Sequence, residues 1–210
     1  MLRTLSGVLL AMMVSFAADA QVLKVVEVAA PAINCVFRTS CSATVDDTSG
    51  NILLPTIPAG TAWLQSRTFT GEPGTPGAGT TAYIYRISLT EAAGNTDCIT
   101  GFTLNFGPHV SLPYMNNQNA DVYVITVGGL GTIGLAKAER FVDVIEFTLQ
   151  KPLCVAGPAN VANTTFFMGL AGIAAPMHVN AVITVTGTTP IYAADARVPT
   201  HSLPPDPGQL

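Results

Sequence analysis

The feature that most constrains the fold is a repeated alternation of apolar and polar side chains, interrupted at short intervals by turn signals. In residues 81–89, for example, Tyr83, Tyr85 and Ile87 fall on one face of an extended chain and Arg86 falls on the other. Alternation of this kind is typical of β-strands that bury one face. It predicts about nine strands, in residues 22–28, 42–46, 62–70, 81–89, 102–106, 121–127, 141–149, 165–170 and 179–186.

Glycine and proline are concentrated between these segments, where turns and loops need them. The longest such stretch, residues 71–79 (GEPGTPGAG), is expected to form an exposed loop. No sustained 3.6-residue pattern with helix caps is present, and only residues 135–140 are compatible with one helical turn. We therefore predict an all-β chain folded as an antiparallel β-sandwich with Greek-key-like connections, whose outer faces carry Thr, Ser and Asn rather than charges.

Charged residues are scarce, at 10% of the chain against about 25% in a typical soluble domain. Together with a net charge of −4, this excludes a basic nucleic-acid-binding protein, and we expect no nucleic-acid partner. The same scarcity leaves few acids and bases for catalysis. The chain also has no G-x-S-x-G motif and no histidine pair at metal-ligand spacing. We therefore expect no enzyme activity, no catalytic residues and no cofactor.

Two arginines, Arg67 and Arg86, interrupt candidate strands that otherwise carry no charge. Such residues belong on an outer face, where pairing with surface carboxylates is the ordinary arrangement. We expect their partners among Glu72, Glu91 and Glu146.

The first twenty residues have the pattern of a secretory signal peptide. Arg3 gives a positive head, residues 5–17 are apolar, and the sequence Ala-Asp-Ala ends at Ala20, where a signal peptidase would cleave. The apolar run is shorter than the roughly 20 residues of a transmembrane helix. We expect export to the periplasm or the medium, with a mature chain that begins at Gln21 and does not span a membrane. An uncleaved anchor is the alternative.

After the predicted signal peptide, residues 1–20, the chain divides into one domain and a tail. Residues 21–189 hold all the candidate strands and are predicted to form the β-sandwich domain. Residues 190–210 hold five prolines, which cannot supply the hydrogen bonds of a β-ladder, and show no strand pattern. We predict a disordered, proline-rich tail or linker there.

The predicted mature chain contains four cysteines, Cys35, Cys41, Cys98 and Cys154. An even number of cysteines in an exported protein is typical of disulfides. Of the three possible pairings we favour Cys35–Cys41, which closes a short local loop, and Cys98–Cys154, which closes a long one. A metal site is the less favoured alternative, because the chain has no C-x-x-C pair and its histidines lie far from the cysteines in sequence.

One polar segment has the spacing of a calcium site. Asn117, Asn119 and Asp121 place oxygen donors at alternate positions, an arrangement that suits a hard cation. Only Asp121 is charged, however, and the Gly and distal Glu of a full calcium loop are missing. The alternative is a polar turn that uses Asn because Asn tolerates a left-handed backbone.

Aromatic side chains are the other candidates for ligand binding. Trp63, Tyr83 and Tyr85 would stack on sugar rings if they were exposed, although aromatic residues in alternating strands more often belong to the core. Asn163 begins an Asn-x-Thr sequence that fits the acceptor of N-glycosylation. Its use depends on the source of the protein.

Three segments are similar to those of a group of uncharacterised exported bacterial β-sandwich proteins. They are residues 64–71 (LQSRTFTG), 83–90 (YIYRISLT) and 128–132 (GGLGT). The resemblance spans most of the predicted mature chain. It implies export and a β fold, and it implies no known activity and no catalytic residues.

The sequence thus predicts a secreted or periplasmic, non-enzymatic surface, matrix or ligand-binding protein. One alternative is a carbohydrate-binding module, with or without calcium support. Another is a structural subunit of a fibre or coat, in which residues 22–28 would add a strand to a neighbour's sheet. Glycans and other surface proteins are the candidate partners.

Overall fold

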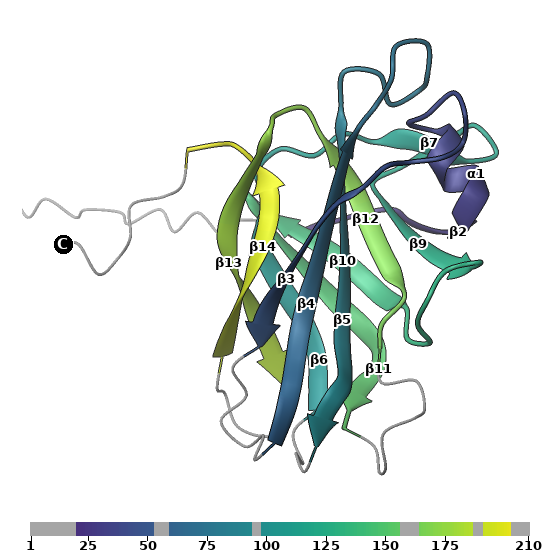
Figure 1. Cartoon of the computed structure of the whole chain (residues 1–210). Coiled ribbons are helices and arrows are strands. Elements are labelled where there is room, and N and C mark those ends of the chain that lie inside the picture. Colours follow the sequence, from purple (N-terminus) through teal and green to yellow (C-terminus); the bar gives the residue numbers. More distant parts are fainter. Residues whose placement is uncertain (1–19, 53–58, 94–97, 156–163, 187–190, 203–210) are drawn as a thin grey trace, which may run out of the picture.

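The computed structural model describes residues 20–52, 59–93, 98–155, 164–186 and 191–202. Within them the chain forms fourteen β-strands and one short α-helix (Figure 1), so the all-β prediction is confirmed. Two sheets of six strands each and a separate hairpin contain these strands.

The strand order is β1-β10-β11-β6-β13-β14 in the first sheet and β2-β9-β12-β5-β4-β3 in the second. The first sheet consists of β1 (Gln21–Val22), β6 (Cys98–Asn105), β10 (Leu135–Phe141), β11 (Val144–Cys154), β13 (Pro176–Val185) and β14 (Ile191–Pro199). The second consists of β2 (Val25–Ala29), β3 (Asp46–Ile52), β4 (Ala59–Thr70), β5 (Thr81–Ala93), β9 (Val122–Val127) and β12 (Phe167–Gly172). The hairpin joins β7 (Leu112–Met115) to β8 (Gln118–Ala120), and the helix α1 is Ala30–Cys35.

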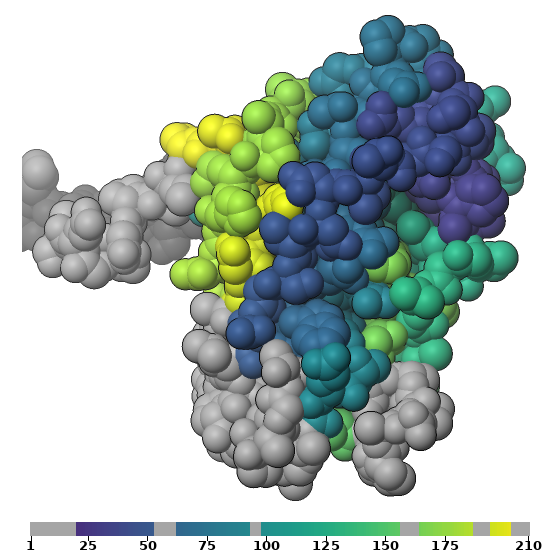
Figure 2. Space-filling model, viewed as in Figure 1, coloured from purple at the N-terminus to yellow at the C-terminus, as the bar shows by residue number. Residues whose placement is uncertain are grey.

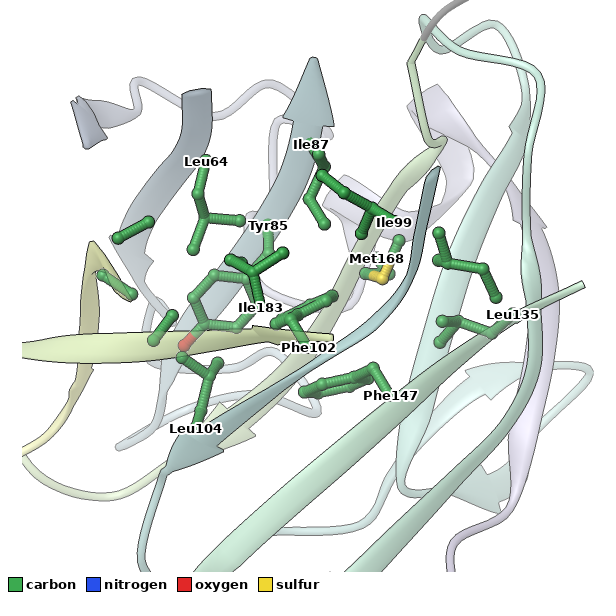
Figure 3. Close-up of a cluster of buried hydrophobic side chains, with 14 of the residues drawn as sticks. Leu64, Tyr85, Ile87, Ile99, Phe102, Leu104, Leu135, Phe147, Met168 and Ile183 are labelled. Atoms are coloured by element: carbon green, nitrogen blue, oxygen red, sulfur yellow. The ribbon is translucent and has the colours of Figure 1, made fainter. Parts of the chain in front are cut away.

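The main core lies between the inner faces of the two sheets, as the alternation predicts (Figure 3). At its centre, Phe102 of β6 stacks on Phe147 of β11 with 4.6 Å between the ring centroids, and Tyr85 of β5 lies 6.0 Å from Phe102. Pairs of this kind contribute about 0.5–1.5 kcal/mol beyond the burial of their area. These rings therefore hold the two sheets together.

A second apolar cluster covers part of the outer face of the second sheet. Phe37, just after α1, packs edge-on against Phe69 of β4 at 5.3 Å, and Tyr114 of β7 lies 4.8 Å from Tyr123 of β9. Figure 1 shows α1 and β7 at the end of the sheet where β2 and β9 lie. The rest of this outer face is left uncovered by α1 and the hairpin.

The helix α1 has only six residues, which is too few to give a helical period in the sequence. Pro31 occupies its first turn, where the missing N–H costs no hydrogen bond. Among the described residues, no helix has the length and apolar character needed to cross a bilayer.

Both predicted cysteine pairings are present. Cys35 at the end of α1 pairs with Cys41, and Cys98 pairs with Cys154. Cys98 and Cys154 are also direct neighbours in the ladder between β6 and β11. The second bridge therefore closes the long stretch from residue 98 to residue 154 between two neighbouring strands of the first sheet.

The prediction of a disordered tail in residues 190–210 is wrong for residues 191–199, which form a strand. β14 occupies Ile191–Pro199, where Ala194, Ala196 and Val198 are buried in the main core. Proline is tolerated here because Pro199 is the last residue of the strand and leaves the interior of the ladder intact. Because alanine is only weakly apolar, Ala194 and Ala196 on the inner face gave no clear apolar–polar alternation in the sequence. Residues 203–210 lie outside the described part of the chain.

β14 also joins the two sheets at one edge of the molecule, where it lies beside β3 (Figure 1). Gly50 of β3 approaches the backbone of β14 so closely that a Cβ atom would lie 2.6 Å from the amide nitrogen of Asp195. The Arg197 side chain, in a residue only 4% exposed, pairs with Asp46 at 2.7 Å and donates to the Thr68 hydroxyl at 2.9 Å. An ion pair between a buried guanidinium and an exposed carboxylate therefore joins the C-terminal strand to the second sheet.

Residues 135–140 are a strand, β10, and the predicted helical turn is wrong. Leu135 and Ala138 are both buried although they are three residues apart. The register shifts between Leu135 and Lys137, so one extra residue brings both onto the inner face. A bulge in a strand can therefore give the same three-residue spacing of apolar side chains as a helical turn.

Other details of the predicted architecture also differ. Fourteen strands in the described residues replace the expected nine, and the Greek-key connections are not confirmed. Residues 42–45 precede a strand that begins only at Asp46. The pair β2–β9 is parallel, which makes the second sheet mixed. β1 and β2 form one stretch that passes from the first sheet to the second.

Candidate functional site

The three predicted aromatic residues do not lie together on the surface. Tyr83 and Tyr85 are fully buried, and their hydroxyls donate to the backbone oxygens of Ala174 at 2.7 Å and Arg197 at 2.5 Å. Both belong to the core. Trp63 is half-buried on the outer face of β4, beside Asn51 of β3.

The predicted calcium ligands also separate. Asn116 and Asn117 have φ values of 51° and 58°, as the turn between β7 and β8 requires, and this agrees with the alternative of a polar turn. Asn117 and Asn119 are exposed, whereas Asp121 is partly buried. In the described residues, no three His, Cys, Asp or Glu side chains gather where they could hold a metal ion.

The Asp121 carboxylate accepts hydrogen bonds from three residues in two other parts of the chain. The Lys24 amide donates to Oδ2 at 2.7 Å, and Oδ1 lies against the Ser111 hydroxyl and 3.3 Å from Nε2 of His109. Burial raises the pKa of Asp121, but the bonds from Ser111, Lys24 and His109 outweigh it and hold the pKa below its ordinary value. The carboxylate thus has structural partners.

Asn163 and the predicted signal peptide up to residue 19 lie outside the described residues.

The clearest hollow in the described structure is a pocket of about 310 Å³ on the outer face of the second sheet. Its base consists of side chains from four strands: Phe69 of β4, Ile84 of β5, Ile125 of β9 and Phe167 of β12. Around it lie α1 with Ala30 and Asn34, the segment before β3 with Ala43 and Val45, and residues 128–130 after β9. The pocket therefore lies where the second apolar cluster ends and the uncovered part of the sheet begins.

Residues 128–130 form one part of this rim, and Gly131 completes their turn (GGLG). Gly131 has a φ of 110°, and a Cβ atom there would lie 2.1 Å from the Thr165 carbonyl oxygen, so the tight approach to the residues before β12 requires glycine. The turn leaves Leu130 60% exposed beside the pocket, and Val45 on the opposite rim is also exposed. Figure 2 shows the segment after β9 (teal-green) standing out beside α1 (purple) on this face. Large apolar side chains gathered in this way are typical of an interaction site.

Two guanidinium groups lie over one aromatic ring at the base of the pocket. The Cζ atoms of Arg67 and Arg86 are 4.4 and 4.8 Å from the centroid of the Phe167 ring. Arg67 donates through Nε to the Asp47 carboxylate at 2.9 Å, and Gln65 donates to the same oxygen at 2.8 Å. Burial, together with repulsion from Arg67, lowers the pKa of Arg86 from its ordinary value. The cationic form of Arg86 is thus poorly compensated.

Two buried polar atoms next to this cluster have no hydrogen-bond partner within the described part of the chain: Nε of Arg86 and Oε1 of Gln65. The two residues face each other across the β4–β5 ladder. Nε of Arg86 is a donor and Oε1 of Gln65 is an acceptor, so each is open to a partner from outside the chain, either water or a ligand.

The expected carboxylate partners of the two arginines were wrong. Arg67 pairs with Asp47, its direct neighbour in the β3–β4 register, because both side chains stand on the outer face. Glu72 instead pairs with Arg38 at 2.9 Å, after the loop 71–79 folds back on the residues following α1. The sequence identified the two arginines as unusual, but their contact with the Phe167 ring could not be predicted from it.

Comparison of the chain with protein-family models, with curated proteins and with solved structures found no match. The similarity of residues 64–71, 83–90 and 128–132 to exported bacterial β-sandwich proteins therefore stays a prediction. We therefore infer the function from the pocket on the outer face of the second sheet.

Proposed function

We propose that the chain is an exported, non-enzymatic β-sandwich protein that binds a small molecule in the pocket on the outer face of its second sheet. The observation that carries this proposal is the pocket itself. Its volume of about 310 Å³ falls within the range of small-molecule sites, about 300–1,000 Å³, and such sites are mostly apolar with a few polar groups. Here Asn34 and Arg67 are the polar side chains among an apolar lining.

Export is supported by two features. The four cysteines form two pairs, and disulfides persist in oxidising compartments. The first strand, β1, begins at Gln21, directly after the predicted cleavage site. A non-enzymatic role is supported by the lining, because the described pocket residues include no His, Cys, Asp, Glu, Lys or Ser for acid–base or nucleophilic chemistry.

A neutral, apolar fluorescent probe, N-phenyl-1-naphthylamine, tests the pocket directly. We expect saturable binding to the mature chain and a loss of binding when Ala43→Trp fills the space between the rim and the base. Ala136→Trp, at an exposed site on β10 of the first sheet, is the matched control and should bind the probe as the native chain does.

Should Ala43→Trp not fold, Leu130→Asp offers a second test, because Leu130 is exposed and its replacement strains no packing. We expect weaker probe binding from the added charge at the rim. Absence of binding to the native chain, or equal binding by the native chain and both pocket variants, would contradict the proposed function.

A second candidate function, carbohydrate binding, rests on Trp63. Its half-buried ring lies on the same outer face as Gln65 and near Asn51, and an aromatic ring beside amide side chains suits a sugar. A glycan array that compares the native chain with Trp63→Ala tests this candidate: glycan binding that depends on Trp63 supports it, and binding that survives the substitution contradicts it. The fibre alternative has no comparable support, since β1 and β2 pair within the chain's own sheets.

A further inference from the structure

We infer that the pocket takes a small amphipathic carboxylate, a molecule with one carboxylate group on an aliphatic chain. This inference rests on the proposed function and adds the chemical class of the ligand. It follows from three observations at and beside the pocket: surplus positive charge, an unpaired buried donor on Arg86 and an apolar cavity with an apolar rim.

The charge at the base of the pocket is not balanced. Arg67 and Arg86 both lie over Phe167, and Asp47 is the one carboxylate paired with either of them in the described residues. One positive charge therefore remains in a partly buried position, where electrostatic interactions are stronger than in water. A ligand with a single negative charge would restore the balance.

One of the two unpaired atoms, the donor on Arg86, fits the same ligand. Nε of Arg86 is a buried donor without a partner among the described residues, and Arg67 makes its ion pair with Asp47 through Nε. A guanidinium presents several N–H donors in one plane, and its geometry matches a carboxylate. Arg67 lines the pocket, so its remaining donors can meet a carboxylate that enters there.

The rest of the pocket suits an aliphatic chain. Phe69, Ile84, Ile125 and Phe167 form the base, and the exposed Leu130 extends the apolar surface outwards. Each methylene group that becomes buried here should improve affinity about fourfold. A ligand with a charged head and a hydrocarbon chain would use both parts of the site.

Calorimetric titration of the full mature chain with octanoate, 1-octanol and octyl phosphate tests the inference. We expect octanoate to bind at least about tenfold more tightly than the alcohol of equal length, because a hydrogen bond to a charged group is worth about that factor. Octanoate should also bind more tightly than octyl phosphate, whose larger charge exceeds the single surplus positive charge. Hexanoate should bind about sixteenfold more weakly than octanoate, since it lacks two methylenes.

Arg86→Gln removes the surplus charge without changing a residue that lines the pocket. We expect this variant to lose the preference for octanoate over octanol, whereas Arg86→Lys should keep most of it. Arg140→Gln, which removes an arginine from β10 of the first sheet, is the matched control and should leave the preference unchanged. Should Arg86→Gln not fold, Arg67→Gln gives the same comparison.

Equal affinities for octanoate and octanol, a preference for octyl phosphate, or an unchanged preference in Arg86→Gln would overturn the ligand class. These outcomes are distinct from failure of the proposed function. If N-phenyl-1-naphthylamine binds in the pocket and octanoate does not displace it, the pocket stands and the carboxylate does not.

Discussion

At the scale of single residues, Asp121 connects segments that are far apart in the sequence. Its carboxylate accepts from the Lys24 amide, before β2, and from Ser111 and His109, before β7. The sequence identified Asp121 as a candidate ligand because it could show the oxygen spacing of residues 117–121 but not these distant donors. The left-handed Asn117, in contrast, was foreseeable from the known tolerance of asparagine for that conformation.

The lowered pKa of Asp121 predicts a dependence of stability on pH. Its folded pKa lies below its unfolded value, about 3.9. The ionised carboxylate therefore contributes its full stabilisation above about pH 4, and this contribution is lost as the pH falls through the folded pKa. Urea unfolding measured between pH 7 and pH 3 should show a fall in the free energy of unfolding at the acid end that is shallower in Asp121→Asn. The same acid dependence in both proteins would contradict this role.

A calcium titration makes the second prediction at this scale. Since both oxygens of Asp121 already accept hydrogen bonds from the protein, calcium would have to displace those donors. We expect the melting temperature to be the same in EDTA and in about 1 mM calcium, because only a ligand of the folded state raises stability. A clear rise in calcium that Asp121→Ala abolishes would instead establish the calcium site.

At the scale of elements, the strands with clear alternation were predictable and the irregular ones were not. Over most of β4 and β13, buried residues alternate with half-buried or exposed ones, and β5 alternates large apolar residues on its inner face, so their sequences predicted them. β10 contains a bulge, β14 uses alanine on its inner face, and α1 is one turn and a half long. Each of these three departs from the regular period on which prediction from sequence depends.

The junction of β14 with the second sheet can be tested by removing either partner of its ion pair. Asp46→Ala leaves the buried Arg197 guanidinium without its carboxylate, and we expect a loss of about 1–3 kcal/mol in the free energy of unfolding. Arg197→Met removes the buried charge and keeps the apolar stem, so we expect a change within about 1 kcal/mol. Urea denaturation of the two variants checks the order. A larger loss in Arg197→Met would contradict this order and show that the other contacts of Arg197, such as its hydrogen bond to Thr68, matter more than the ion pair.

The two disulfides should differ in their contribution to stability. The Cys98–Cys154 bridge spans 56 positions and the Cys35–Cys41 bridge spans 6. In the chain-entropy model these loops correspond to about 4 and about 2 kcal/mol. Paired Cys→Ala variants of each bridge, compared by thermal unfolding, should therefore show the greater loss for the long loop. An equal or opposite effect would mean that local structure around α1 outweighs chain entropy.

At the scale of the whole molecule, the sequence predicted an all-β chain with two specific disulfides, and it could not predict the pocket. The lining residues range from Ala30 to Phe167, and they meet only because α1 and residues 128–130 fold onto the second sheet. Local patterns determine which face of a strand is buried. They do not determine which distant segments cover that face, so the pairing of Arg67 and Arg86 with Phe167 emerged only from the structure.

Export makes a prediction for the whole chain. If residues 1–20 are a cleaved signal peptide, N-terminal sequencing of the protein recovered from the periplasm or the medium should begin at Gln21. The first strand begins at that residue, so cleavage there would leave the fold intact. Recovery of an exported protein that still begins at Met1 would contradict the signal peptide and favour an anchor.

We propose that the outer face of the second sheet holds a ligand site at Phe167. A crystal structure of the mature chain grown with octanoate would reveal whether a ligand occupies that site. We expect two six-stranded sheets, with ligand density between α1 and residues 128–130 and a carboxylate against the guanidinium of Arg67. A pocket filled by the protein's own side chains, or octanoate bound only elsewhere, would contradict it.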